Sequence, residues 1–244
     1  MTESRAGSQV ELNAIILGQQ LFGEAHKIVW LCTLEQGKIS AMAMNAARST
    51  RRFGAALQAG NFVRAYFKAP RELSHSETLW ALEKLDIRAD FAHLRSDYSL
   101  LESAFFALRF VQDIVPADSG DPSVFKALGR FLRDSQAYPY RKGCSLLRIA
   151  FWSWMAHHFG FGDLTRELET TLKKLGDGVV SCWHHHLAQA EPNFLGLFEQ
   201  LESRNIETIQ LADEVAIYKR WVSLSGVHWE HFEKWLISKN YSLS

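Results

Sequence analysis

The spacing of apolar and polar residues along the chain changes near residue 80. The first eighty residues contain short runs rich in aliphatic, β-branched and aromatic residues, separated by polar turns, which is typical of strands. Five such runs are predicted as strands: 11–22, 27–34, 39–44, 62–69 and 72–80. The sequence Glu-Gln-Gly-Lys at 35–38 supplies a glycine-containing turn, so the second and third runs form a hairpin.

The run 62–69 alternates strictly between polar or aromatic and apolar residues. Successive side chains of a strand point to opposite faces, so this run has two distinct faces. One face carries Phe62, Arg64, Tyr66 and Lys68, and the other carries Val63, Ala65 and Phe67. The second face is predicted to lie in a core.

From residue 81 onward the apolar residues recur with the period of a helix. Asp121 followed by Pro122 is the favoured order of helix cap and first helical residue, and Ser96 or Asp97 can cap the preceding helix. The segment 146–160 is apolar on most sides, which predicts a helix at the centre of a bundle. The other predicted helices lie within 96–116, 120–135, 163–176, 179–189, 192–203, 209–224 and 228–238.

These patterns predict an α+β protein with two domains. Residues 1–80 are expected to form a five-stranded OB-fold β-barrel, because five short strands follow one another without a long helix between most of them. Residues 81–244 are expected to form an all-α helical bundle. A small SH3-like barrel is the alternative for the first domain.

Composition is that of an ordinary globular protein. The chain has 244 residues, of which 47% are hydrophobic and 22% are charged. No apolar run approaches the roughly 18 to 20 residues needed to cross a bilayer, and the N-terminus lacks an apolar signal core. Three cysteines far apart in the sequence argue against a disulfide framework. A cytoplasmic location is therefore expected.

The charge is balanced overall, 27 basic against 27 acidic residues, but one segment departs from this balance. Residues 36–71 contain no Asp or Glu. Their seven basic residues are Lys38, Arg48, Arg51, Arg52, Arg64, Lys68 and Arg71. Cations that follow a phosphate backbone, with aromatic rings such as Phe62 and Tyr66 among them, are what binding of single-stranded nucleic acid requires. The segment therefore predicts a DNA-binding face on the barrel that includes Tyr66.

Two other classes of function stay open from the residues alone. The barrel could bind the acidic surface of a partner protein, as an interaction adaptor. A metal-dependent enzyme could use the histidines, since Cys182 and His186 are four residues apart, His184 to His186 are consecutive, and His228 and His231 are three apart. The usual catalytic and nucleotide-binding motifs are absent from the sequence, so we expect no enzyme activity, no metal and no cofactor.

Residues 22–60 resemble the N-terminal signature of the bacterial DNA repair protein RecO family. The matching positions are Phe22-Gly23-Glu24, Ile28-Val29, Thr33, Gly37, Ala43 to Arg48, and Arg51-Arg52-Phe53 to Leu57. The chain departs from the family pattern at His26, at Met44-Asn45 and at Ala59, and it lacks zinc-ribbon cysteines after the sequence His-His-Phe-Gly-Phe-Gly at 157–162.

The resemblance implies a non-enzymatic mediator of recombinational repair in the bacterial cytoplasm, associated with the nucleoid. Such a protein binds single- and double-stranded DNA, anneals complementary strands, docks on the C-terminal tail of the single-stranded DNA-binding protein SSB and, with RecR, helps to load RecA on SSB-coated DNA. The tail is acidic and ends in hydrophobic residues, so its receptor needs an apolar pocket beside a cation. The predicted tail site on the helix near 140–160 consists of Arg141, Leu147, Arg148, Phe151, Trp152 and Met155.

Overall fold

The computed structural model describes residues 9–49, 52–68, 79–117, 119–137, 144–160, 169–170, 172–173, 177–202, 215–216, 218–219, 222–223 and 229–238. The chain divides into two compact units. The first comprises Met1–Phe91 with Leu108–Gly129, and the second comprises Ala92–Ala107 with Arg130–Ser244. The domain boundary at residue 80 stays a prediction.

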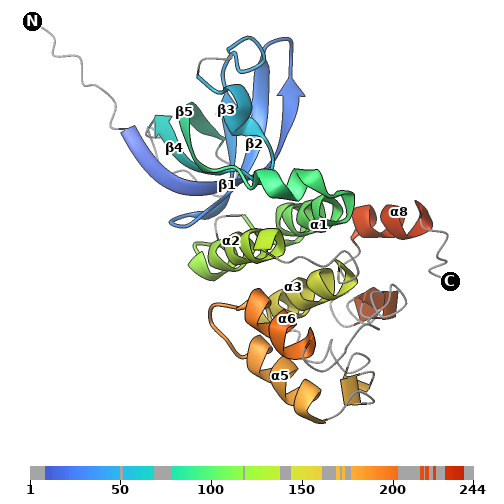
Figure 1. The fold of residues 1–244 in the computed structure, drawn as a ribbon. Coiled ribbons are helices and arrows are strands. Elements are labelled where there is room, and N and C mark those ends of the chain that lie inside the picture. The colour runs from blue at the N-terminus through green and yellow to red at the C-terminus, as the bar shows by residue number, and fades with distance from the viewer. Residues whose placement is uncertain are drawn as a thin grey trace, which may run out of the picture. The chain divides into compact units, whose positions relative to one another are not determined.

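In the first unit five strands close into a barrel (Figure 1). The strands are β1 (Gln9–Phe22), β2 (His26–Thr33), β3 (Gly37–Ala43), β4 (Phe62–Lys68) and β5 (Trp80–Ala89), and the short helix η1 (Gly54–Leu57) lies between β3 and β4 in the sequence. Their order around the barrel is β1-β2-β3-β5-β4. Only the β3–β5 pair is parallel among the described strands. The predicted OB-type barrel is confirmed.

Alternation along β4 divides its residues as predicted. Val63, Ala65 and Phe67 are fully buried in the barrel core, and the residues between them are partly or fully exposed. Buried aliphatic residues from every other strand complete this core, for example Ile16, Leu31, Ile39 and Leu82. The sequence pattern succeeds here because β4 has one apolar face and one solvent-facing face.

The last strand lies further along the chain than predicted. A strand was expected over 72–80, whereas β5 runs from Trp80 to Ala89, and residues 72–78 lie outside the described residues. The sequence of β5 does not alternate cleanly: its buried residues, Leu82 and Leu85, are three apart. The register between β4 and β5 shifts at Tyr66/Phe67 and at Phe62/Val63, which breaks the period of two. The helical period therefore does not begin at residue 81.

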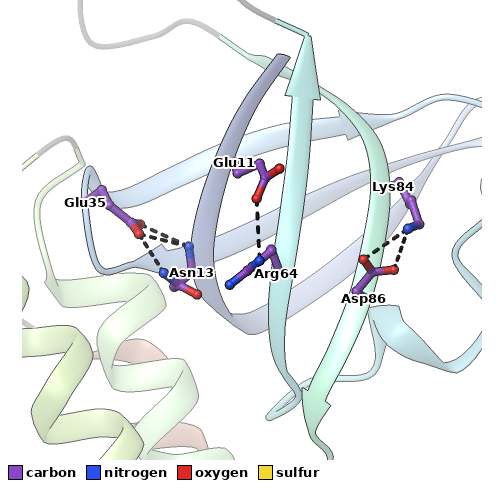
Figure 2. A network of polar contacts seen from close by, with 6 residues as sticks. All are labelled: Glu11, Asn13, Glu35, Arg64, Lys84 and Asp86. Atoms are coloured by element: carbon purple, nitrogen blue, oxygen red, sulfur yellow. Dashed lines mark hydrogen bonds and ion pairs between the residues drawn. The ribbon is translucent and has the colours of Figure 1, made fainter.

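The turn between β2 and β3 is held by contacts on both sides. Thr33 Oγ1 donates to the Gly37 carbonyl and accepts from the Gln36 amide. The Glu35 carboxylate accepts from the backbone and side-chain amides of Asn13 on β1, at 2.9–3.2 Å (Figure 2). Next to the turn, Lys38 forms a parallel bridge with Ala117. The turn is therefore fixed against both β1 and the segment that follows α1.

We expect Gly37→Ala to lower the free energy of unfolding by about 2 kcal/mol. Gly37 has a φ of 70°, and a Cβ there would lie 2.8 Å from Ser119 Oγ and 2.9 Å from the Gly120 amide nitrogen. Gly23→Ala is the matched control, because Gly23 has a φ of 61° with nothing within 4 Å of its Cβ position. It should cost about 1 kcal/mol, from strain alone. Urea unfolding compares the two; equal losses would show that the Ser119 contact contributes nothing.

Helices make up the rest of the described chain. They are η2 (Ala92–Ser96), α1 (Tyr98–Ile114), α2 (Pro122–Ala137), α3 (Cys144–His158), α5 (Asp177–Leu187), α6 (Phe194–Glu202) and α8 (Glu230–Ser238). The caps are those predicted: Asp97 Oδ1 accepts from the Ser99 and Leu100 amides, and Asp121 Oδ1 accepts from the Ser123 amide. An α-helical region after the barrel is therefore confirmed. Of the predicted helices 163–176 and 209–224, most residues lie outside the described ranges.

The core of the second unit is rich in aromatic residues. Phe106 of α1, Trp152 of α3 and Phe232 of α8 contact one another with ring centroids 5.1–5.8 Å apart. Trp229 stacks on Phe232 at 5.5 Å. These rings fill space between helices, which is the ordinary role of tryptophan in a helical core. Within the part of the chain that the structure describes, the helices are all too short or too polar to span a membrane.

Candidate nucleic-acid interface

The outer face of β4 carries three of the predicted DNA-binding residues, but neighbouring strands bring carboxylates beside them. Arg64 Nη1 lies 3.7 Å from Glu11 Oε2 of β1. On β5, Lys84 Nζ lies 2.8 Å from Asp86 Oδ1, and the same ammonium lies 5.1 Å from the centroid of the Tyr66 ring. Figure 2 shows the acid–base pairs on these adjacent strands. The segment that is free of acids in sequence is thus not free of acids in space.

Tyr66 is half-buried and already has partners. Lys84 Nζ lies over its ring. The hydrogen bond from Lys84 is the largest cause that lowers the pKa of the Asp86 carboxyl, and the Tyr66 hydroxyl helps to lower it, so this carboxylate is ionised near neutral pH. Lys68, at the end of β4, is exposed. Of the predicted residues on this face, Lys68 is therefore the most open to a phosphate.

Lys38 does not lie on an open cationic face. Its Nζ donates to the carbonyl of Gln112 at 2.7 Å, in the last turn of α1. Carbonyls in the last turn have no helical partner, and a cation there is favoured by the helix dipole. Burial lowers the pKa of Lys38, an effect that Asp113 partly offsets. The structure thus gives Lys38 a structural role beside α1.

Arg48 and Arg52 lie together on the loop that follows β3. Arg48 has a largely exposed side chain, and its Nη2 is 3.9 Å from Oε2 of Glu24, which is almost fully exposed. Arg52 Nη2 donates to the Met44 carbonyl at 3.2 Å, and its guanidinium carbon lies 4.8 Å from the Phe53 ring centroid. Exposed ion pairs of this length contribute little, so Arg48 stays available to a phosphate. Arg51 and Arg71 lie outside the described residues.

This loop is joined to the tip of the β1–β2 hairpin by two hydrogen bonds. The Ala47 amide donates to the Ala25 carbonyl at 3.0 Å, and the Asn45 amide donates to His26 Nδ1 at 3.0 Å. Asn45 has a φ of 56°, in the left-handed region that asparagine tolerates better than most residues. The hairpin tip and the cationic loop therefore form one surface, which we call the loop end of the barrel (residues 18–30, 40–49 and 52).

Large apolar side chains are exposed at the loop end. Phe22, Leu21 and Met44 are 51%, 58% and 48% exposed. Sequence reasoning missed them: it used Phe22-Gly23-Glu24 as part of a family signature and did not recognise the Gly23 turn as the tip of a hairpin. The signal was available, since Gly23 and Glu24 separate two apolar runs.

The predicted SSB-tail residues are core residues of α3. Arg148 is 5% exposed, and the apolar residues of the predicted site are buried: Leu147, Phe151, Trp152 and Met155. Arg148 Nη1 lies 3.8 Å from Glu102 Oε2 and donates to Ser103 Oγ at 3.1 Å, both on α1. The prediction that these side chains line an exposed groove is wrong, because α3 is packed on most sides. Arg141 lies outside the described residues.

The histidine and cysteine residues do not form a metal centre in the described part of the chain. No group of three or more His, Cys, Asp or Glu side chains is arranged there to hold an ion. His186 is buried, with Nε2 3.4 Å from the Ala150 carbonyl, and burial lowers its pKa to about 4. Burial raises the pKa of the Cys32 thiol to about 12, so it stays protonated near neutral pH. His228 lies outside the described residues.

The described residues thus define a small OB-type barrel with a cationic loop end, continued by helices. Residues 8–83 match the family model "Recombination protein O N terminal". Proteins named "DNA repair protein RecO" are similar to the chain: one from Pelobacter propionicus is 33% identical over 129 residues, covering 53% of this chain and 50% of the relative. The relative from Anaeromyxobacter sp. (strain K) is 32% identical over 133 residues, covering 54% and 51%.

A third relative, from Geobacter metallireducens, is 32% identical over 119 residues, covering 49% of this chain and 46% of the relative. The chain spans about half the length of the curated relatives it matches. Residues 8–83 therefore match the RecO N-terminal family model, and the chain is similar to RecO proteins over about half of its length. Neither the family description nor the names of these relatives denotes a catalytic activity.

Proposed function

We propose that the protein acts in DNA repair and recombination as a non-enzymatic mediator that binds single- and double-stranded DNA through its barrel. The family of residues 8–83 and the names of the relatives support this role. The observation that carries the DNA-binding site is the pair of exposed arginines, Arg48 and Arg52, on a loop hydrogen-bonded around the hairpin tip. OB folds bind oligonucleotides with the face of strands 2 and 3 and with adjoining loops, which is where this surface lies.

The other predicted cations have smaller roles in this proposal. Arg64 and Lys68 would add general attraction for phosphates, reduced by the carboxylates of Glu11 and Asp86 nearby. Arg51 and Arg71 belong to the same basic segment and are proposed as further phosphate contacts on the basis of sequence. Lys38 is omitted from the proposed contacts because its ammonium is bound to the end of α1.

The further activities follow from the resemblance to RecO. We propose that the protein anneals complementary strands, contacts the SSB tail and, with RecR, helps to load RecA on SSB-coated DNA in the bacterial cytoplasm, at the nucleoid. The tail site is not placed on α3, since the side chains predicted to form it there are buried.

Annealing of SSB-coated complementary strands tests the proposal. Two labelled strands, each saturated with SSB, are mixed with and without the full chain, and duplex formation is followed by fluorescence transfer. We expect the protein to raise the annealing rate at least tenfold, because it must both hold the strands and displace SSB. An unchanged rate would overturn the proposed mediator role.

The main alternative is a protein-interaction adaptor whose barrel binds a partner protein rather than DNA. The exposed apolar side chains of the loop end favour it, since exposed apolar patches mark interaction sites of several kinds. Filter binding with labelled oligonucleotides separates the two classes. An adaptor would retain no oligonucleotide at 50 mM salt, whereas the proposed protein would retain single strands.

A further inference from the structure

We propose that the outer face of β2 and β3 at the loop end is a base-binding platform that selects single-stranded over double-stranded nucleic acid. This inference rests on the proposed DNA-binding function and deepens it. The platform consists of Phe22, Ile28, Trp30, Met42 and Met44, which lie on neighbouring strands or directly after one of them.

Strand register places these side chains in adjacent rows. Ile28 pairs with Met42, and Trp30, two residues along β2, pairs with Ser40 and with Gly18 of β1. The residues that alternate with them, Val29, Leu31 and Ala41, are buried in the barrel. Ile28, Trp30 and Met42 therefore share the outer face, where each is half-exposed.

The rows continue to the hairpin tip. Phe22 pairs with His26, two residues before Ile28, so its ring lies on the same outer face as Ile28 and diagonal to it. Met44 follows Ala43, the last paired residue of β3, which lies opposite Lys27. The outer face thus becomes more exposed toward the tip, from partly buried at Trp30 to 51% exposed at Phe22 and 48% exposed at Met44.

Two arginines of the loop after β3 lie next to this platform. Arg52 is hydrogen-bonded to the carbonyl of Met44, and Arg48 lies beside the hairpin tip through its contact with Glu24. Between residues 18 and 52 the sequence has two acids, Glu24 and Glu35, and the carboxylate of Glu35 is hydrogen-bonded to Asn13 on another side of the barrel. An apolar surface bordered by cations matches a chain that presents flat apolar rings and an anionic backbone together.

Single-stranded nucleic acid fits this surface better than a duplex does. In a duplex the faces of the bases are stacked on one another. A protein ring can therefore reach them only if bases unstack, which costs free energy. In a single strand the bases are accessible and every base has a ring face, so stacking is tolerant of sequence. The platform is therefore expected to add affinity for single strands and none for duplex, whereas Arg48 and Arg52 serve both.

Tyr66 on β4 does not provide an equivalent platform. Its ring is half-buried below the ammonium of Lys84, and the Asp86 carboxylate bonded to that ammonium lies on the same strand as Lys84. A base stacking there would have to displace Lys84 and approach a carboxylate. The Phe22 ring is 51% exposed and lies at the hairpin tip, where Arg48 contacts Glu24, so the loop end is the better place for a base.

The test combines a protein change with a DNA change. Binding of the full chain and of Phe22→Ala is measured by fluorescence anisotropy with an oligothymidine, with an abasic strand of the same length and with a duplex. We expect Phe22→Ala to weaken binding to oligothymidine about tenfold, the loss typical of one stacked base. Binding to the abasic strand and to the duplex should be unchanged, because both offer phosphates without accessible bases.

Phe22→Leu and Tyr98→Ala complete the design. Phe22→Leu keeps apolar volume and the fold of the hairpin, so an intermediate loss on oligothymidine alone supports ring stacking. Tyr98, 74% exposed at the start of α1, is the matched control, and its removal should change nothing. Equal losses on intact and abasic strands, or no loss, would overturn the platform while leaving DNA binding intact. Failure of the unmodified protein to bind any of the three would overturn the proposed function itself.

Discussion

Arg148→Ala is expected to lower the free energy of unfolding by about 3 kcal/mol. The Arg148 side chain is 6% exposed, lies 3.8 Å from the Glu102 carboxylate and donates to Ser103 Oγ. Removing the guanidinium takes a positive charge away from the Glu102 carboxylate, which is 20% exposed. It also leaves a cavity between α1 and α3. Denaturant unfolding followed by far-UV circular dichroism measures the loss.

Arg133→Ala provides the matched control for this prediction. Arg133 also lies beside a carboxylate, 3.9 Å from Asp134, but 64% of its side chain is exposed. Asp134 is itself buried, but it keeps the Leu195 amide as a donor and the Arg133 guanidinium is mostly in solvent, so removal of Arg133 should cost about 1 kcal/mol or less. Similar small losses for both variants would show that Arg148 is not held as a core residue, and α3 would become a candidate for tail binding again. If the expected result is found, substitutions at Arg148 lower folding stability rather than act directly on the binding of a partner.

The double substitution Arg48→Glu and Arg52→Glu is expected to weaken binding of single-stranded DNA at least about 100-fold at 50 mM salt. Each charge-assisted contact with a phosphate is worth about 1.5 kcal/mol or more, roughly a factor of ten, and the introduced carboxylates add repulsion. Both side chains are on the surface, so the melting temperature should stay nearly constant. Anisotropy titrations at several salt concentrations measure the affinity.

The slope of log affinity against log salt gives a second measure of the same interactions. It should become shallower by about 0.7 for each phosphate of a single strand that the variant no longer neutralises. Arg64→Ala with Lys68→Ala is the control pair on β4. We expect less than a threefold loss of affinity from it, because the carboxylates of Glu11 and Asp86 already offset the positive charge of that face. A larger loss from the β4 pair than from the loop pair would move the DNA site to β4.

Local sequence patterns were enough to predict the barrel and its first four strands. Alternation in β4 works because Val63, Ala65 and Phe67 all face one core while their neighbours face solvent. The pattern failed at β5, where register shifts place the buried Leu82 and Leu85 three residues apart. A strand with irregular register and many charged residues resembles a helix surface in sequence, and tertiary pairing decides between them.

The charge pattern predicted a basic face that the structure only partly supports. A run of sequence without acids says nothing about the strands that pair with it. Glu11 on β1 lies beside Arg64, and Asp86 on β5 is the register partner of Arg64. Lys38 was misjudged for a similar reason, since its partner is a carbonyl of α1. Arg48 and Arg52 lie on a loop and stay exposed, and their role in DNA binding stays a prediction.

The prediction of a tail pocket on α3 conflicted with another pattern in the same residues. A helix that is apolar on most sides is expected to be buried, and Phe151, Trp152 and Met155 are buried. Such a helix cannot also present these side chains to a partner. The all-round apolar pattern was the stronger signal, because it rests on every residue of the helix rather than on one arginine near two rings.

Photo-crosslinking tests most directly whether the loop end is the DNA site. A single strand containing 4-thiothymidine is bound to the full chain, irradiated, and the crosslinked peptides are mapped by mass spectrometry. We predict that crosslinks concentrate within residues 18–30, 40–49 and 52, with Phe22 and Met44 among the modified positions. Crosslinks confined to β4 and β5, residues 62–68 and 80–89, or to the helices from α3 onward, would contradict the account.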